Sequence, residues 1–241
     1  MSSEEAPAVP KKKWSKRRKI IVSSSIISSI LIVALLACVV IPYFSQIDRT
    51  YSWSYGGSEW TLNKTIPGNS YSHYKESSHT YQELYGASGY VYYVTDNDPE
   101  IESLAHSLYS DSVLSGCSKY ETISFILAFI QSLPYTSDAV TTGHDEYPRY
   151  PLETLVDYGG DCEDTAILFA SIVQTDWFNH DATLFLYPSH MAVGVWGSPS
   201  LGGGYYYQER YYLYCETTSD GWKIGEIPDE YEDVTPTFID V

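Results

Sequence analysis

Positively charged side chains are scarce along most of this chain of 241 residues. Only seven lysines and arginines follow residue 19, against 29 acidic side chains, so this part carries a formal charge of −22, whereas the whole chain carries −17. A surface this acidic repels the phosphates of nucleic acids and the headgroups of anionic lipids, which argues against both as partners. Few lysines beside abundant tyrosine, serine and glycine are typical of a secreted or surface-displayed domain.

Cysteine is also rare, with four in the chain. Cys38 lies in an apolar run, and Cys117 and Cys215 can pair in an oxidising exterior, which would leave Cys162 as a free thiol. A lone thiol in an acidic exterior domain raises the expectation that it reacts. A zinc site on Cys162 is disfavoured, because no second Cys or His stands at ligand spacing from it.

Charge is absent from residues 20–41, a run of 22 residues that is closed by Pro42. Such a helix is about 33 Å long, enough to cross a hydrocarbon core of about 30 Å. Seven basic residues precede the run, and only Arg49 closely follows it. The positive-inside rule therefore predicts a basic cytoplasmic tail at 1–19, a single transmembrane helix within 20–44, and an extracellular remainder.

Other interpretations of this segment fit less well. A cleaved signal peptide has a shorter apolar core and a small-residue cleavage site. The stretch Leu35-Leu-Ala-Cys38 faintly resembles a bacterial lipoprotein box, but the chain stays apolar after it. A buried core helix is disfavoured by the length of the run and by its basic flank.

About 195 residues follow the predicted anchor, enough for one domain, and they contain no internal repeat. Residues 45–97 form a lead-in rich in Tyr and Trp, in which alternation at 51–55 and 90–95 predicts strands. The sequence Asp98-Pro-Glu predicts a helix start. It does not fit an EF-hand, because the glycine at position six and the later glutamate are missing.

Residues 98–241 are expected to form the main domain. Apolar spacing predicts a second helix at about 119–133, followed by a polar surface loop at 135–150. Asp161 is a candidate N-cap for a third helix that carries Cys162 in its first turn and has a wide apolar face.

After residue 179 the apolar pattern changes to a period of two. It predicts strands at 182–187, 190–196 and 205–217, the last two joined by the glycine-rich residues 197–204, and a mostly irregular tail. Because helices and strands are segregated, we expect an α+β fold whose central Cys-bearing helix packs on an antiparallel sheet.

The start of this third helix holds the candidate nucleophile, Cys162. The helix dipole favours the Cys162 thiolate, but Asp161, Glu163 and Asp164 raise the pKa of the thiol. A histidine partner is therefore required, and His190 is the best candidate, because small residues share its strand face. Taken alone, His190 also fits an ordinary strand histidine bonded to a carbonyl.

A carboxylate can orient that histidine. If the strands around residues 197–204 form a hairpin centred near Gly203, residue 190 lies opposite Glu216, with Cβ atoms about 5 Å apart. Glu216 would then fix the ring tautomer and stabilise the imidazolium. A slip of one residue would put Cys215 there instead, and Asp220 is the second choice.

Residues 98–228 resemble transglutaminase-like domains, especially the membrane-anchored versions of methanogenic archaea. The resemblance implies a papain-like core with Cys162 as nucleophile and with His190 and Glu216 on the packed sheet. The family's third residue is usually aspartate, so Glu216 departs from the pattern. The matching motifs are Leu133-Pro-Tyr, Arg149-Tyr-Pro-Leu-Glu-Thr-Leu, Gly159-Gly-Asp-Cys-Glu-Asp, Pro188-Ser-His and Cys215-Glu-Thr-Thr.

These residues predict acyl transfer through a thioester. Cys162 attacks an amide carbonyl, His190 accepts the thiol proton and later protonates the leaving amine, and the Cys162 backbone N–H is an oxyanion donor. Hydrolysis of a peptide or protein substrate is expected over cross-linking, because known cross-linking members depend on calcium and carry extra domains. No cofactor or metal is expected. The alternative is a catalytically inactive module for surface binding or scaffolding, and the oligomeric state stays open.

Overall fold

The computed structural model describes residues 28–32 and 45–241. Most of the predicted anchor at 20–44, and all of the basic tail before it, lie outside these ranges. Within them, no helix combines the length and the apolar character that a membrane crossing requires. Residues Gln46–Val241 form a unit of their own with two sheets and a set of helices.

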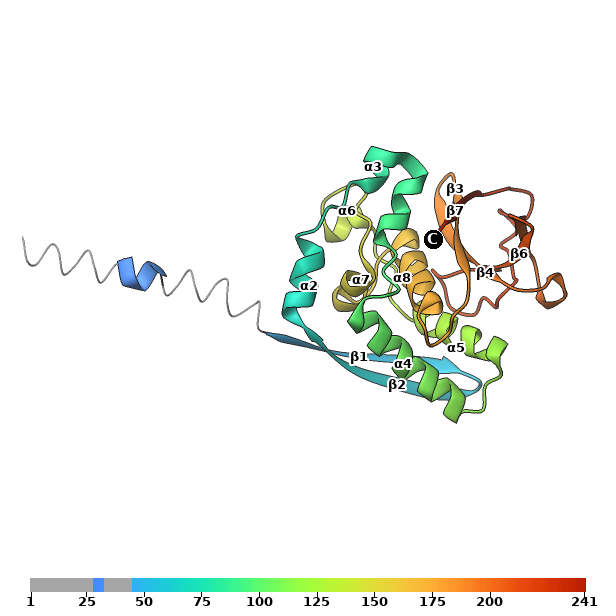
Figure 1. The fold of residues 1–241 in the computed structure, drawn as a ribbon, viewed down its shortest axis with the longest axis horizontal. Coiled ribbons are helices and arrows are strands. Elements are labelled where there is room, and N and C mark those ends of the chain that lie inside the picture. The colour runs from blue at the N-terminus through green and yellow to red at the C-terminus, as the bar shows by residue number, and fades with distance from the viewer. Residues whose placement is uncertain (1–27, 33–44) are drawn as a thin grey trace, which may run out of the picture. The chain divides into compact units, whose positions relative to one another are not determined.

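The first sheet is a hairpin of β1 (Gln46–Tyr55) and β2 (Ser58–Pro67). The turn uses Gly56 and Gly57, both at positive φ, a conformation that glycine adopts without steric cost. Tyr51 and Trp53 alternate toward the interior and pack edge-on against Phe129. The alternation at 51–55 thus predicts a strand correctly. Figure 1 shows the hairpin beside α4 and α5.

The helical part comprises α2 (Gly68–Lys75), α3 (Tyr81–Tyr85), η1 (Gly86–Tyr93), α4 (Pro99–Leu114), α5 (Lys119–Gln131), α6 (Asp138–Thr141), α7 (Pro151–Asp157) and α8 (Cys162–Gln174). The predicted start of α4 is confirmed, because Asp98 Oδ1 accepts the backbone N–H groups of Glu100 and Ile101 at 2.8 and 3.1 Å. A capping box between Ser118 and Glu121 begins α5, the second predicted helix.

One prediction about local structure is wrong, and a second is incomplete. Residues 90–95, predicted as a strand, lie largely in the 3-10 helix η1, in which Tyr90 and Tyr93 share one buried face at a spacing of three. The predicted loop 135–150 contains α6, and α7 follows it directly. Short helices such as these have too few apolar positions to show a period in the sequence.

The second sheet has the order β5-β6-β4-β3-β7, and all of its neighbours are antiparallel. Its strands are β3 (Ala182–Tyr187), β4 (His190–Trp196), β5 (Gly204–Tyr207), β6 (Arg210–Cys215) and β7 (Thr237–Asp240). The bounds predicted for β3 and β4 are confirmed. The predicted strand 205–217 is instead two strands, because Gln208 and Glu209 both adopt positive φ and reverse the chain. The tail, predicted as mostly irregular, supplies β7.

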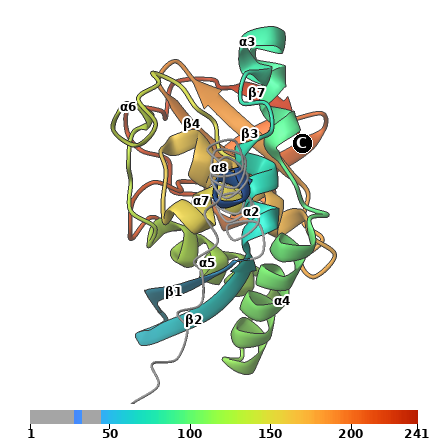
Figure 2. The same cartoon turned by 90° about the vertical axis from the view of Figure 1, so that its left-hand side faces the viewer.

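Helix α8 lies at the centre of this unit. Its residues from Ala166 to Val173 are fully buried, packed against β3 and β4 on one side and against α4, α5 and α7 on the other. Figures 1 and 2 show α8 between the sheet and the other helices. The predicted α+β arrangement, with a central Cys-bearing helix on an antiparallel sheet, is confirmed.

Candidate active site

Two glycines bring the chain into α8 immediately before Cys162. Gly159 has φ +131°, and a Cβ added there would collide with the carbonyl of Pro134. A Cβ on Gly160 would collide with the carboxyl group of Asp164. The Gly160 carbonyl also accepts the Thr136 N–H at 2.9 Å, which ties this turn to the segment after α5. The close approach therefore requires glycine at both positions and places Cys162 at the first residue of the helix.

The Cys162 thiol lies between its own helix and the start of β4. Its Sγ donates to Glu163 Oε2 at 3.3 Å. Burial raises the pKa of the thiol well above its ordinary value, and the Glu163 carboxyl adds to the increase, while the backbone N–H of Met191 opposes it. Because Met191 directly follows His190, the thiol and the predicted base come from adjoining parts of helix and sheet.

His190 and Glu216 form a direct pair. His190 Nε2 lies 2.9 Å from Glu216 Oε2, and Tyr231 stacks on the imidazole with ring centroids 5.0 Å apart and planes 6° from parallel. The His190 side chain is 11% exposed and that of Glu216 only 4%. With Nε2 engaged by the carboxylate, Nδ1 is the ring nitrogen that can face a thiol or a substrate.

Glu216 is held by more than the histidine. Its Oε1 accepts the backbone N–H and the hydroxyl of Thr218 at 3.0 and 2.6 Å, and its Oε2 accepts the Tyr214 hydroxyl at 2.8 Å. Burial alone would raise the pKa of Glu216, but hydrogen bonds from His190 and Thr218 outweigh it and lower the pKa below its usual value. Glu216 is therefore ionised at neutral pH and can orient an imidazolium.

The strand register behind this pair differs from the prediction. Val193 pairs with Cys215, so continuing the register would put residue 190 opposite residue 218, two residues from the predicted partner. A shift of two keeps Glu216 on the same face of the sheet, because side chains alternate with a period of two. The two other candidates are placed elsewhere. Cys215 is fully buried in the core, and Asp220 is exposed.

Three carboxylates gather at the start of α8. Ligand oxygens of Asp138, Asp161 and Glu163 all lie within 4.8 Å of one another. Burial and the neighbouring acids raise the pKa of Glu163 to about 10. Asp161 Oδ1 is buried without a hydrogen-bond partner among the described residues. Such a set of oxygen donors fits a hard divalent cation, which would neutralise the repulsion.

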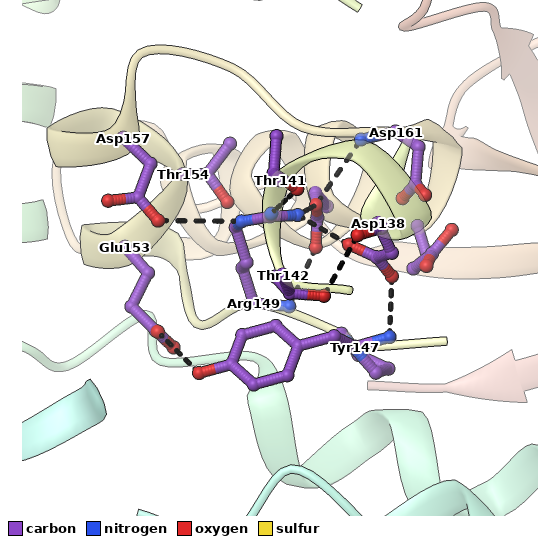
Figure 3. A network of polar contacts seen from close by, with 12 residues as sticks. Asp138, Thr141, Thr142, Tyr147, Arg149, Glu153, Thr154, Asp157 and Asp161 are labelled. Atoms are coloured by element: carbon purple, nitrogen blue, oxygen red, sulfur yellow. Dashed lines mark hydrogen bonds and ion pairs between the residues drawn. The ribbon is translucent and has the colours of Figure 1, made fainter. Parts of the chain in front are cut away.

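Arg149 holds one side of this cluster of three carboxylates in place (Figure 3). Its guanidinium is 1% exposed, contacts Asp164, and donates to Asp138 Oδ1 at 2.8 Å and to Thr141 Oγ1 at 2.6 Å. Its backbone N–H donates to Asp164 Oδ1 at 2.6 Å. The buried guanidinium of Arg149 thus connects α6 to the first turn of α8.

Sequence reasoning did not assign Arg149 or Asp138 to the site. Asp138 stands 24 residues before Cys162 in a segment predicted to be a surface loop, so no spacing rule joins them. The available signal was Arg149 itself, one of the few basic residues in an acidic chain.

The structure does not contain the disulfide between Cys117 and Cys215 that the sequence left open. Cys117, Cys162 and Cys215 are all free thiols. Cys215 is directed into the core from β6, whereas Cys117 lies partly exposed before α5, where its Sγ is 3.2 Å from the Ser115 hydroxyl. Cys162 is therefore not distinguished by being the unpaired cysteine, but by its place at the helix start.

No protein-family model matches the chain, and no curated protein sequence matches it. The solved structure of calcium-bound Legionella pneumophila LapG is similar over 69% of this chain and 78% of LapG, with 20% identity and a TM-score of 0.36. EGTA-treated LapG is similar over 70% and 78%, with 19% identity and a TM-score of 0.38. A solved TGase is similar over 77% of this chain and 48% of its own, with 11% identity and a TM-score of 0.33.

Proposed function

We propose that this protein is a thiol hydrolase that cleaves amide bonds in a peptide or protein substrate. The observation that carries the proposal is the hydrogen-bonded pair of His190 and Glu216, together with the contact of the Cys162 thiol, at a helix N-terminus, with the backbone of Met191, the residue after His190. A nucleophile, a base and a buried carboxylate that orients the base are the three groups that such chemistry needs.

In this mechanism the Cys162 thiol gives its proton to His190 and its sulfur attacks the amide carbonyl. The amine leaves with the proton from His190, and a thioester remains on Cys162. His190 then removes a proton from water, which attacks the thioester and releases the acid and the free thiol. The backbone N–H of Cys162, at the start of α8, would donate to the oxyanion.

The cluster of three carboxylates at the start of α8 would hold a divalent cation such as Ca²⁺. Asp138, Asp161 and Glu163 supply the oxygens, and the unpartnered Oδ1 of Asp161 supports this assignment. Bound there, the cation would displace the proton of Glu163 and offset the charge of the carboxylates beside the Cys162 thiol.

We further propose that the enzyme works outside the cell, tethered by the apolar run at 20–44. The charge asymmetry around that run supports this orientation, and the acidic remainder suits an exposed domain. The transglutaminase-like assignment of the domain belongs to the same proposal, because it rests on the sequence motifs.

One observation favours the alternative, a catalytically inactive binding or scaffolding module. The Cys162 thiol donates to Glu163, and burial together with this carboxyl raises the pKa of the thiol above its ordinary value. A thiol held in this way is a poor nucleophile unless histidine or a cation changes its surroundings.

Alkylation of the full-length chain distinguishes the two functions. The chain is treated with iodoacetamide at neutral pH, with Ca²⁺ or with a chelator, and each modified cysteine is quantified by peptide mass. In the presence of Ca²⁺, we expect Cys162 of the wild-type chain to react at least about tenfold faster than Cys162 of the His190→Ala variant. Cys117, which is partly exposed and distant in sequence, is the internal control. Equal rates at Cys162 in both proteins, with and without Ca²⁺, would favour the inactive module.

A further inference from the structure

A cavity of about 540 Å³ opens beside the pair of His190 and Glu216. Besides that pair, three aromatic rings and one further acid contribute to its wall. The lining residues are Tyr135, His190, Glu216, Thr218, Ser219, Trp222, Pro228, Glu230 and Tyr231.

The two carboxylates of this cavity wall face no permanently positive side chain within it. No lysine or arginine lines it. The seven basic residues after residue 19 are placed elsewhere, and six of them contact other groups, as Lys75, Arg149 and Arg210 do with carboxylates. Glu216 is compensated by His190, whereas Glu230 is exposed and has no basic partner among the described ion pairs. Glu230 is therefore the uncompensated charge in the cavity wall.

The aromatic rings make the same cavity suited to a cation. The Tyr135 side chain is 56% exposed, and Trp222 and Tyr231 are half-buried. Tyr231 already lies flat on the imidazole of His190. Faces of Trp and Tyr attract ammonium and guanidinium groups through their quadrupoles, and a nearby carboxylate adds a direct charge.

We propose that this cavity is a subsite for a positively charged group of the substrate, a lysine or arginine side chain, held by Glu230 and the rings of Tyr135 and Trp222. The inference rests on the proposed function, since the subsite serves the same active site. It adds a substrate class, a peptide with a basic residue close to the scissile amide.

The test uses the full-length Cys162→Ala variant, which binds without reacting. The probes are alanine-based peptide amides that each carry one lysine at a different position, with a matched set in which norleucine replaces lysine. Binding is followed by tryptophan fluorescence, since Trp222 lines the cavity. We expect the best lysine peptide to bind about tenfold tighter than its norleucine match, because a carboxylate and aromatic faces act together.

Two pairs of variants make the test specific. Glu230→Gln should reduce the preference for lysine to about twofold or less, whereas Glu232→Gln, which removes an equal charge outside the cavity lining, should leave it unchanged. Tyr135→Phe should keep the preference and Tyr135→Leu should weaken it, because only the former retains the ring.

The inference is overturned if no lysine peptide binds better than its norleucine match, or if Glu230→Gln and Glu232→Gln have equal effects. The proposed function is tested separately, by hydrolysis of the same peptides with the wild-type chain. Selective binding without hydrolysis would refute the enzyme and leave a binding site for a basic group, whereas hydrolysis without selectivity would refute the subsite and leave the enzyme.

Discussion

At the scale of single residues, Glu216 anchors its pair with His190 to the rest of the fold. It accepts hydrogen bonds from His190, Tyr214 and Thr218 while almost fully buried. A buried carboxylate with this many donors contributes to stability only while it is ionised. Its lowered pKa therefore links the orienting role to the pH dependence of folding.

Replacing Glu216 by Gln should lower the free energy of unfolding by about 2 kcal/mol at pH 7, because charge-assisted hydrogen bonds are lost. Since the folded pKa is below the unfolded one, this contribution is complete above the unfolded pKa of about 4.5 and disappears as the pH falls through the folded pKa. Urea unfolding of both proteins at neutral and at acidic pH measures the difference. A difference that stays constant with pH would contradict the account.

Gly159 is the second residue on which the site depends. Gly159→Ala should destabilise the fold by about 3 kcal/mol or more, because the new Cβ meets the Pro134 carbonyl and the backbone is left-handed. Gly143→Ala is the matched control, since Gly143 also has positive φ but open space around it, and it should cost about 1 kcal/mol. Thermal unfolding compares the two variants, and equal losses would show that the close approach does not matter.

At the scale of elements, Arg149 joins α6 to the first turn of α8. Its guanidinium is buried between Asp138 and Asp164. Burial and the surrounding acids raise the pKa of Asp164, and the guanidinium of Arg149 opposes this increase. The element that carries Cys162 is therefore held by a buried charge pair as well as by apolar packing.

Arg149→Met should cost about 3–5 kcal/mol of stability, because it leaves carboxyl groups buried without their cation. Arg49→Met is the matched control: Arg49 donates to the Val156 carbonyl from a partly exposed position, and its loss should cost about 1 kcal/mol. Denaturant unfolding measures both variants. If Arg149→Met is no worse than Arg49→Met, the buried pair does not hold the start of α8.

Most of the long elements could be predicted from the sequence. Asp98 and Ser118 mark the starts of α4 and α5 with capping chemistry that acts locally, and alternation defines β3 and β4. β7 could not be predicted, because its four residues become a strand only by pairing with β3, more than 50 residues earlier. Such a pairing is tertiary, and a short edge strand carries no period of its own.

The candidate site could be predicted only in part, because some of its residues meet through tertiary contacts alone. His190 and Glu216 share a sheet face, so even a register that was wrong by two residues brought them together. The cluster of three carboxylates could not be predicted, because Asp138 and Asp161 meet only after the chain from α6 returns to α8. The catalytic roles of Cys162, His190 and Glu216 stay predictions.

At the scale of the whole molecule, the acidic charge makes the chain sensitive to cations. Ca²⁺ at about 1 mM should raise the melting temperature of the full chain by a few degrees, because a ligand that binds only the folded state stabilises it. Asp161→Asn should abolish this shift, whereas Asp145→Asn, at an exposed acid outside the group, should keep it. An equal shift in both variants would indicate diffuse screening and not a site.

The most direct measurement of the central claim is to trap an acyl-enzyme. The full-length chain is mixed with an activated acetyl ester in the presence of Ca²⁺, quenched in acid at short times, and mapped by peptide mass. The account predicts an acetyl group on Cys162 that appears and then hydrolyses in the wild-type chain, and that is lost in the His190→Ala variant. The account is contradicted if Cys162 is never acylated, or if its acylation does not depend on His190.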